Sequence, residues 1–327
     1  MAQMTETAAA QAEQTYRVAP KGFTPELLET FVRDGFAILD VRLSDDELAY
    51  YREAAQEVFA KADNCARPHG GPFDPMKTNK IMNVCPMHPA FSDLIDHDRH
   101  IGYAYDIFGE QTKLIQAELF YRPGEQSPDS SQNWHLDGPR AVPYKAFAPE
   151  LPLKLRISYW LTDFPERNRG NFVYVPGSHL PEYRKEHLGL APDPREVPLM
   201  VEAWTITIAN GGIWHRVEPN LGPEARTTIF MSYSPSWVVG YYGYDPEWLQ
   251  TLTREQRILL RAYDDDQEAY SRPPAEDYPL FLDRETHSDR ELNGFLEEER
   301  HKWRRYTMWE KMQHAKRVAA GAEIIGV

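Results

Sequence analysis

The chain has 327 residues, of which 42% are hydrophobic and 26% are charged. These fractions are typical of a globular protein that buries a sizeable core, and they exclude disordered, collagen-like and small disulfide-rich proteins. With 36 basic against 50 acidic residues, the net charge of −14 has the wrong sign for a protein whose main partner is nucleic acid or an anionic membrane.

The remaining broad features favour a soluble protein. No apolar run approaches the ~18 residues that a membrane helix needs. The first residues include acidic side chains and lack the apolar block of a secretory signal. The two cysteines, Cys65 and Cys85, provide neither a disulfide framework nor a zinc site by themselves. We therefore expect a cytoplasmic protein with no membrane partner and no nucleic-acid partner.

The N-terminal part predicts a tail followed by a helix. Residues 1–20 are expected to form a flexible tail, and residues 21–327 a single domain. Thr24 is a suitable helix N-cap because Pro25 follows it at the first helical position. This helix is expected to end near Asp34, just before a glycine.

A strand and a second helix are predicted next. The apolar run Phe36–Leu39 is typical of a strand. Ser44–Glu47 has the pattern of a capping box and should open a helix that continues to about Ala62. Turn-forming residues outnumber periodic ones from there to about His88, so no regular element is predicted in that stretch.

From about residue 112 to 235 the pattern changes to short β-type runs separated by turn residues. Several short strands with few intervening helices predict a mostly β fold with flanking helices and a sandwich or jelly-roll core, not a doubly wound sheet. The expected strands lie in Lys113–Tyr121, Leu155–Leu161, Phe172–Val175, Trp204–Ile208 and Thr227–Tyr233.

The chain is predicted to become helical again after Gly243. Asp245–Glu247 caps one expected helix, and Ser288–Glu291 is a second capping box. The helix that begins at Ser288 carries apolar side chains along one face. That face either packs on the β core or forms the surface of a homodimer, and the sequence leaves both open.

The motif with the clearest chemistry lies in Asn133–Pro139. On a strand, His135 and Asp137 project to one face while Leu136 projects to the other. One imidazole and one carboxylate are two of the three ligands of the facial triad that binds non-haem Fe(II) and leaves open coordination positions. The third ligand has to be a histidine from a distant strand, and the candidate is His215.

Arg226 lies 11 residues beyond this histidine, at the start of an apolar strand. An arginine that points into an apolar core is costly unless it meets an anion. Its planar guanidinium matches a carboxylate with two hydrogen bonds, each worth about 1.5–3 kcal/mol. A keto acid with two carboxylates would chelate the metal at one end and meet Arg226 at the other, and Thr228 on the same strand face could add a hydroxyl donor.

His-x-Asp by itself is weak evidence for a metal site. Its simpler interpretation is a strand-end histidine bonded to a nearby carboxylate. The combination with a late histidine and an arginine 11 residues further on arises by accident much less often. His179 is expected to be a turn residue, and His97 and His100 are expected on a solvated helix face because charged residues surround them.

Several aromatic and basic residues have two interpretations. The tryptophans are most simply core residues, although Trp134 and Trp214 are also candidates to line a substrate pocket. Arg140, just after the metal motif, is a candidate contact for an anionic substrate, while a surface arginine is the commoner outcome.

The stretch from about residue 35 to 233 resembles the phytanoyl-CoA dioxygenase family of Fe(II)- and 2-oxoglutarate-dependent oxygenases. Gly35–Leu39 followed by Leu43–Leu48 is similar to the family's opening strand and helix, Trp134–Asp137 to its first metal motif, Val175–His179 to its Pro-Gly-Ser-His turn, and His215 with Pro219, Asn220 and Arg226 to its closing motif. The resemblance implies a double-stranded β-helix, that is, a jelly-roll or cupin-like core. It also implies His135, Asp137 and His215 as Fe(II) ligands and Arg226 as the residue that holds 2-oxoglutarate.

Two positions depart from the family pattern. Arg169-Gly170 stands where the family often has Asn-Gly, and Tyr121-Arg122 stands near a position where the family commonly has lysine. The further candidates for contacts with 2-oxoglutarate are Lys113, Gln116, Tyr121 and Arg122, and we take Gln116 and Tyr121 as the expected ones.

The resemblance implies oxidative decarboxylation of 2-oxoglutarate by O2, with release of succinate and CO2. The carboxylate of Asp137 favours hydroxylation or a related desaturation or ring formation, because halogenating relatives usually replace it with a small residue. A small-molecule metabolite or natural product is the expected substrate, whereas acyl-CoA fits poorly with the acidic composition. The alternatives are a non-redox jelly-roll metalloenzyme, such as an isomerase or lyase, and a catalytically silent binding protein of the same fold.

Overall fold

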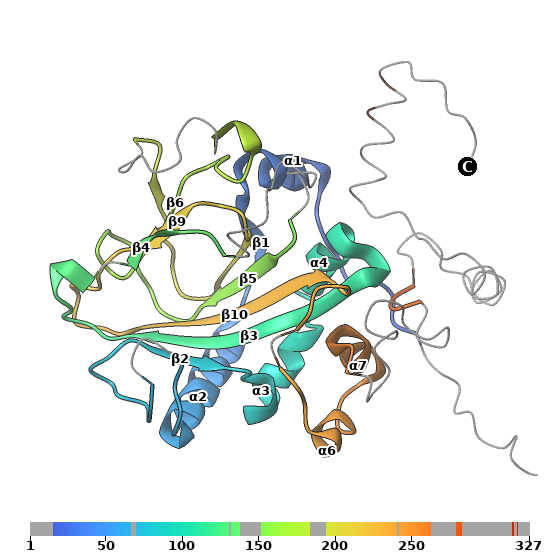
Figure 1. Cartoon of the computed structure of the whole chain (residues 1–327), viewed down its shortest axis with the longest axis horizontal. Helices are drawn as coiled ribbons and strands as arrows, with labels where there is room; N and C mark the ends of the chain where they lie inside the picture. The colour runs from blue at the N-terminus through green and yellow to red at the C-terminus, as the bar shows by residue number, and fades with distance from the viewer. Residues whose placement is uncertain are drawn as a thin grey trace, which may run out of the picture.

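The computed structural model describes residues 16–66, 70–130, 132–137, 152–183, 194–240, 242–262 and 279–282, together with positions 316 and 319. Its centre is formed by two antiparallel sheets (Figure 1). The larger sheet has six strands in the order β1-β8-β5-β10-β3-β2, and the smaller has four in the order β4-β9-β6-β7. The predicted mostly β fold with flanking helices is confirmed.

The long strands occur where the sequence predicted them. Their ends agree with the predicted ends within three residues, and the short strands β2, β4, β7 and β9 were not predicted as separate elements. The strands are β1 (Phe36–Arg42), β2 (Asn79–Met82), β3 (Thr112–Arg122), β4 (Gln132–His135), β5 (Leu155–Trp160), β6 (Phe172–Tyr174), β7 (Val197–Pro198), β8 (Thr205–Asn210), β9 (His215–Val217) and β10 (Arg226–Pro235).

Side-chain caps fix the helix ends. Ser44 accepts a hydrogen bond from the backbone of Glu47, whose carboxylate in turn accepts one from the backbone of Ser44. The described helices are α1 (Pro25–Asp34), α2 (Asp45–Lys61), α3 (Pro89–Ser92), α4 (Ile101–Phe108), α6 (Pro246–Leu249) and α7 (Arg254–Leu260), with short 3₁₀ turns at Cys85–Met87, Asp93–Ile95, Gly109–Gln111 and Pro128–Ser130. None of the described helices is both long and apolar enough to cross a membrane.

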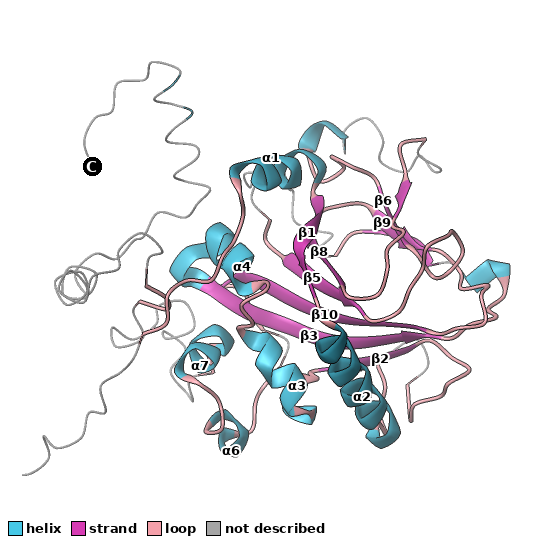
Figure 2. Cartoon of the chain, turned by 180° about the vertical axis from the view of Figure 1, so that it is seen from behind, coloured by secondary structure: helices cyan, strands magenta, loops and turns pink. Residues whose placement is uncertain are grey.

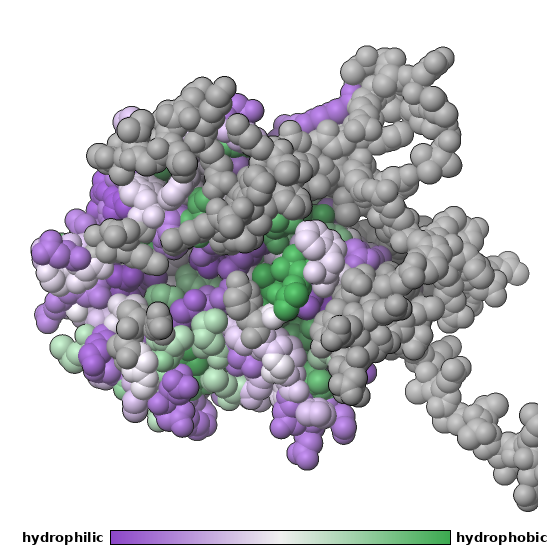
Figure 3. All heavy atoms as spheres, in the orientation of Figure 1, coloured by the Kyte–Doolittle hydropathy of each residue, from purple (hydrophilic) through white to green (hydrophobic). Residues whose placement is uncertain are grey.

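The two faces of the larger sheet have different partners because side chains alternate along each strand. On β10, Ile229 and Met231 belong to the core under the helices, whereas Phe230 belongs to a second core between the sheets. Helices α2, α3 and α7 cover the outer face, as Figure 2 shows from behind. On the described part of the face shown in Figure 3, hydrophilic side chains predominate. The inner face of the larger sheet, which these helices do not cover, contributes apolar residues such as Phe230 and charged residues such as Arg226 to the space between the sheets.

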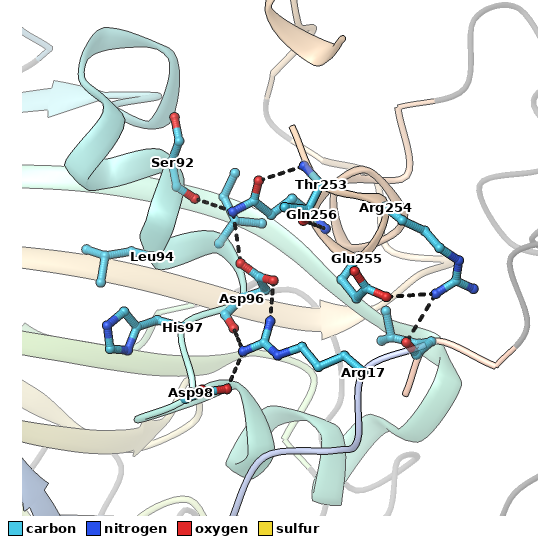
Figure 4. Close-up of polar contacts among 12 residues, drawn as sticks. Arg17, Ser92, Leu94, Asp96, His97, Asp98, Thr253, Arg254, Glu255 and Gln256 are labelled. Atoms are coloured by element: carbon cyan, nitrogen blue, oxygen red, sulfur yellow. Dashed lines mark hydrogen bonds and ion pairs between the residues drawn. The ribbon is translucent and has the colours of Figure 1, made fainter. Parts of the chain in front are cut away.

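Residues 16–20 differ from the predicted tail. A β-bridge joins this segment to Leu282, and the guanidinium of Arg17 bonds to the carboxylate and backbone oxygen of Asp96 (Figure 4). The side-chain amide of Gln256 donates to the same carboxylate at 2.9 Å. This buried network ties the segment to the body of the protein, which local composition did not indicate.

His100 also differs from its predicted surface position. It is fully buried, with Nδ1 against the hydroxyl of Tyr159 and Nε2 2.6 Å from the hydroxyl of Tyr233. These tyrosines belong to the central strands β5 and β10, so partners distant in sequence satisfy the imidazole in the core. The expected role of Arg140 and the predicted helix from Ser288, with its possible homodimer surface, lie outside the described residues.

We predict that Ser44→Ala lowers the free energy of unfolding by about 1 kcal/mol, because the first turn of α2 loses its side-chain cap. Thermal unfolding followed by circular dichroism measures this change as a lower Tm. Ser44→Asp is the matched control, since its carboxylate also accepts the bond from Glu47. Equal melting temperatures for the alanine and aspartate variants would contradict the assignment.

Candidate functional site

The three predicted ligand residues converge between the sheets. His135 ends β4 and lies opposite His215, which begins β9, while Asp137 follows in the bend after β4. One donor atom from each residue lies within 4.8 Å of the donors of the other two. Nε2 of His215 is 3.8 Å from Oδ2 of Asp137. This spacing suits three ligands around one metal ion.

The backbone sets the tautomer of His215. Its Nδ1 lies 3.0 Å from the carbonyl oxygen of Ile213, and a carbonyl only accepts, so Nδ1 carries the hydrogen and the lone pair is on Nε2. Burial lowers the pKa of His215 to about 4, which keeps the ring neutral at pH 7. A metal ligand has to be deprotonated, and the second hydrogen bond of the ring fixes its orientation.

Asp137 is ionised although it is largely enclosed. Burial by itself would raise its pKa, but the adjacent Arg156 guanidinium, together with smaller effects of His215, Lys154 and His135, outweighs this and holds the pKa of Asp137 below its usual range. Two neutral imidazoles and a carboxylate form the ligand set of non-haem Fe(II) sites, with coordination positions left for other molecules. The site can thus bind a divalent metal ion with this donor set.

The triad opens into a cavity of about 440 Å³. Aromatic rings form much of its wall, and the ring of Phe172 packs on that of His215 with centroids 4.9 Å apart. The described residues that line it are Thr78, Lys80, Glu118, Phe120, Arg122, Ser130, His135, Asp137, Arg156, Trp160, Phe172, His215, Val217, Arg226 and Phe230.

Two buried arginines line the same cavity. Arg226 and Arg122 face each other across the pairing of β10 with β3, and each is 4% exposed. Burial, with a smaller effect from Arg122, lowers the pKa of Arg226, and burial lowers the pKa of Arg122 to about 10. Among the described residues, no carboxylate forms an ion pair with either one. Two desolvated cations without a counterion favour an anionic ligand.

Gly170 holds these two arginines in place. Its carbonyl oxygen accepts a hydrogen bond from Nη1 of Arg226. Its backbone has φ +76°, and a Cβ there would lie 2.9 Å from Cδ of Arg122. The second residue of the Arg169-Gly170 pair therefore has to be glycine both for its conformation and for the space beside Arg122.

The other residues expected to contact the keto acid lie in different places. Thr228 is fully buried on the same strand as Arg226, and its hydroxyl has no hydrogen-bond partner. Oε1 of Gln116 accepts from Nζ of Lys154 at 2.7 Å, so this amide is engaged beside the cavity. Tyr121 points to the outer face, where its hydroxyl lies 3.2 Å from the carbonyl oxygen of Pro75.

Tyr121, which was expected to contact 2-oxoglutarate, does not face the cavity. Because side chains alternate along β3, Arg122 and not Tyr121 faces the cavity, and the ring of Tyr121 packs instead against Phe59 and Phe73. Neither tryptophan proposed as a substrate contact is among the described lining residues. The guanidinium of Arg216 lies over the ring of Trp134, at 5.5 Å from its centroid.

Sequence reasoning missed three charged lining residues: Lys80, Glu118 and Arg156. The sequence could have indicated two of them. Glu118 and Arg156 each lie between two apolar residues of a predicted strand, and these apolar residues pack on the outer face, so the charged residue has to face inward. Lys80 gave no comparable signal, since it lies on the short strand β2 in a stretch where turn residues predominated.

Comparison with known proteins gives consistent matches. A sequence model described as phytanoyl-CoA dioxygenase (PhyH) matches residues 31–228. Ectoine dioxygenase of Nocardia farcinica is 24% identical over 241 residues, which is 64% of this chain and 77% of that protein.

Two solved structures share the fold at low sequence identity. HygX of Streptomyces hygroscopicus, solved with nickel and 2-oxoglutarate bound, matches with a TM-score of 0.54 and 17% identity over 69% of this chain and 92% of that chain. EctD of S. alaskensis, solved with 2-oxoglutarate and 5-hydroxyectoine, gives a TM-score of 0.52 and 20% identity over 69% and 80%, respectively. The architecture of this chain is therefore the jelly-roll fold that it shares with these proteins.

We predict that His215→Ala weakens the binding of Co(II), used as a spectroscopic probe, by at least about tenfold, because one of three donors is removed. Anaerobic titration followed by visible absorption measures the affinity. His179→Gln is the control, because His179 lies outside the triad. Its Nε2 bonds to the carbonyl oxygen of Val32, and the glutamine amide can donate to the same oxygen. Equal affinities for the two variants would show that His215 is not a ligand.

Proposed function

This chain belongs to the phytanoyl-CoA dioxygenase (PhyH) family, and we propose that it oxidises a C–H bond of a small-molecule metabolite or natural product. It is a non-haem iron dioxygenase whose co-substrates are 2-oxoglutarate and O2. One observation carries the proposal. Three converging metal donors and two buried arginines, which have no carboxylate partner among the described residues, open into one cavity.

His135, Asp137 and His215 are proposed to bind the iron. Bound there, the metal supplies the oxidising chemistry that converts 2-oxoglutarate and O2 to succinate and CO2 while a C–H bond is broken. The protein itself positions the donor atoms. The Ile213 carbonyl orients the imidazole of His215, and the pairing of β4 with β9 places the imidazole of His135 beside it.

Arg226 and Arg122 are proposed to bind the distal carboxylate of 2-oxoglutarate. Their guanidinium groups are buried and lack a described counterion, and each charge-assisted hydrogen bond contributes about 1.5–3 kcal/mol. The hydroxyl of Thr228 is buried on the same strand and is a further donor from that side. The keto acid would thus be held at both ends, by the metal and by this arginine pair.

The walls of the cavity are suited to exclude water from the reaction. Trp160, Phe172 and Phe230 line it, and their rings form the apolar part of its wall. Where these rings exclude water, they strengthen the ionic contacts inside the cavity and limit side reactions with solvent.

The reaction is proposed to be hydroxylation or a related oxidation such as desaturation or ring formation. Asp137 keeps the carboxylate ligand, so halogenation is not proposed. Ectoine dioxygenases are among the relatives. SnoK of nogalamycin biosynthesis, a 2-oxoglutarate-dependent carbocyclase, shares the fold with a TM-score of 0.52. This range supports a small-molecule substrate, and we propose that the protein acts in the cytoplasm.

The proposal is tested in two steps. Anaerobic addition of Fe(II) and then 2-oxoglutarate should give a metal-to-ligand charge-transfer band. Aerobic incubation with a panel of metabolites should then release succinate together with O2 uptake. Asp137→Ala should lose the succinate release, because the metal loses its carboxylate ligand. A missing band in the native protein would favour the silent binding protein, and substrate conversion without succinate would favour an isomerase or lyase.

We predict that Arg226→Ala raises the KM for 2-oxoglutarate at least about tenfold, since the distal carboxylate loses a bidentate partner. Succinate formation at varied 2-oxoglutarate concentration measures this. Tyr121→Phe is the control and should leave the KM unchanged, because the Tyr121 hydroxyl bonds to Pro75 outside the cavity. An unchanged KM in the Arg226 variant would remove this residue from the binding site.

A further inference from the structure

The described wall of the cavity carries more positive charge than the proposed chemistry uses. Four cationic side chains line it against two anionic ones, which leaves a surplus of two positive charges; the cations are Lys80, Arg122, Arg156 and Arg226, and the anions are Glu118 and Asp137. The whole chain has a net charge of −14, so this surplus is local. A cavity of one sign attracts ligands of the opposite sign.

Loading the site does not remove the surplus. This step rests on the proposed function, in which the cavity receives Fe(II) and the dianion of 2-oxoglutarate. The charge of +2 on Fe(II) and the charge of −2 on 2-oxoglutarate cancel. The net charge of the loaded cavity is therefore still that of its lining side chains. Because these side chains are mostly buried, unpaired charge is costly there, and a further anion would be stabilised.

Three of the four cations have a partner in this scheme. Nζ of Lys80 lies 2.5 Å from Oε1 of Glu118, whose side chain is only 1% exposed. Arg122 and Arg226 share the distal carboxylate of 2-oxoglutarate. Among the described residues, Arg156 pairs only with Asp137, whose single charge is also required by the metal.

Arg156 is held rigidly at the metal end of the cavity. It lies in β5, a central strand, with Ala209 of β8 on one side and Ser232 of β10 on the other. Its guanidinium lies 4.7 Å from the ring centroid of Phe230, and its side chain is 13% exposed. The guanidinium therefore has a fixed position next to the triad and borders the space that a substrate would enter.

We propose that the primary substrate carries a carboxylate or a comparable anionic group, and that Arg156 binds this group. A planar guanidinium binds a carboxylate through two parallel hydrogen bonds, which fixes orientation as well as position. Anchoring the anion beside the triad places the neighbouring carbons of the substrate close to the metal. Arg156 is then the residue that selects which C–H bond is presented for oxidation.

The test uses anaerobic protein loaded with Fe(II) and 2-oxoglutarate, in which the charge-transfer band is recorded first. Acetate and benzoate are then titrated, each against its neutral amide, acetamide or benzamide. The carboxylates should perturb the band with saturation, and the amides should not. Arg156→Met should weaken carboxylate binding at least about tenfold, which corresponds to about 1.4 kcal/mol, and Arg156→Lys should retain part of it because the charge remains.

Arg167→Met is the matched control because it makes the same change in net charge outside the cavity, at a side chain that is 48% exposed. It should bind the carboxylates as the native protein does. Absence of the charge-transfer band would defeat the proposed function itself. A band that responds equally to acids and amides, or to neither, would overturn both the anionic substrate and the role of Arg156, while the proposed function would stand. A methionine variant that binds benzoate normally but requires more 2-oxoglutarate would overturn the role of Arg156 as well, because this residue would then serve the co-substrate.

Discussion

The antiparallel pairing of β4 with β9 is the contact on which the candidate site depends. It places His135 opposite His215 although 80 positions separate them in the chain. Asp137 follows two residues later and completes the donor set without a further element. Because both histidines are tied to strand backbone, the donors are positioned before any metal binds, and little conformational entropy is lost when it does.

Alternation along the strands explains how one sheet supports both stability and chemistry. The outer residues of β5 and β10 pack under the helices, where Ile157 and Met231 are fully buried. The inner residues of the same strands include Arg156 and Arg226, which line the cavity. Each charged side chain is thus anchored in a strand whose opposite face is fixed by the hydrophobic core. This arrangement compensates the cost of buried charge with packing on the other side.

The balance of charge within the cavity connects the site to its ligands. Arg122 and Arg226 lie at one end, with Gly170 between them in a conformation that favours glycine. Arg156 and Asp137 lie at the metal end. A metal ion at one end and the arginine pair at the other suit a molecule with anionic groups at both of its ends, such as 2-oxoglutarate. The cationic charge left over points to the character of the second substrate.

The sequence alone determined the order of the longer strands, their ends to within three residues, and the candidate ligands, because caps, period-two alternation and the His-x-Asp motif are local patterns. It also indicated Arg226, through its distance from His215. Only the tertiary structure decided that Arg122 and not Tyr121 faces the cavity, that residues 16–20 pack on the body of the protein, and that His100 is buried between two tyrosines. Those outcomes depend on strand register and on partners far away in the chain, and neither leaves a mark on the residues nearby.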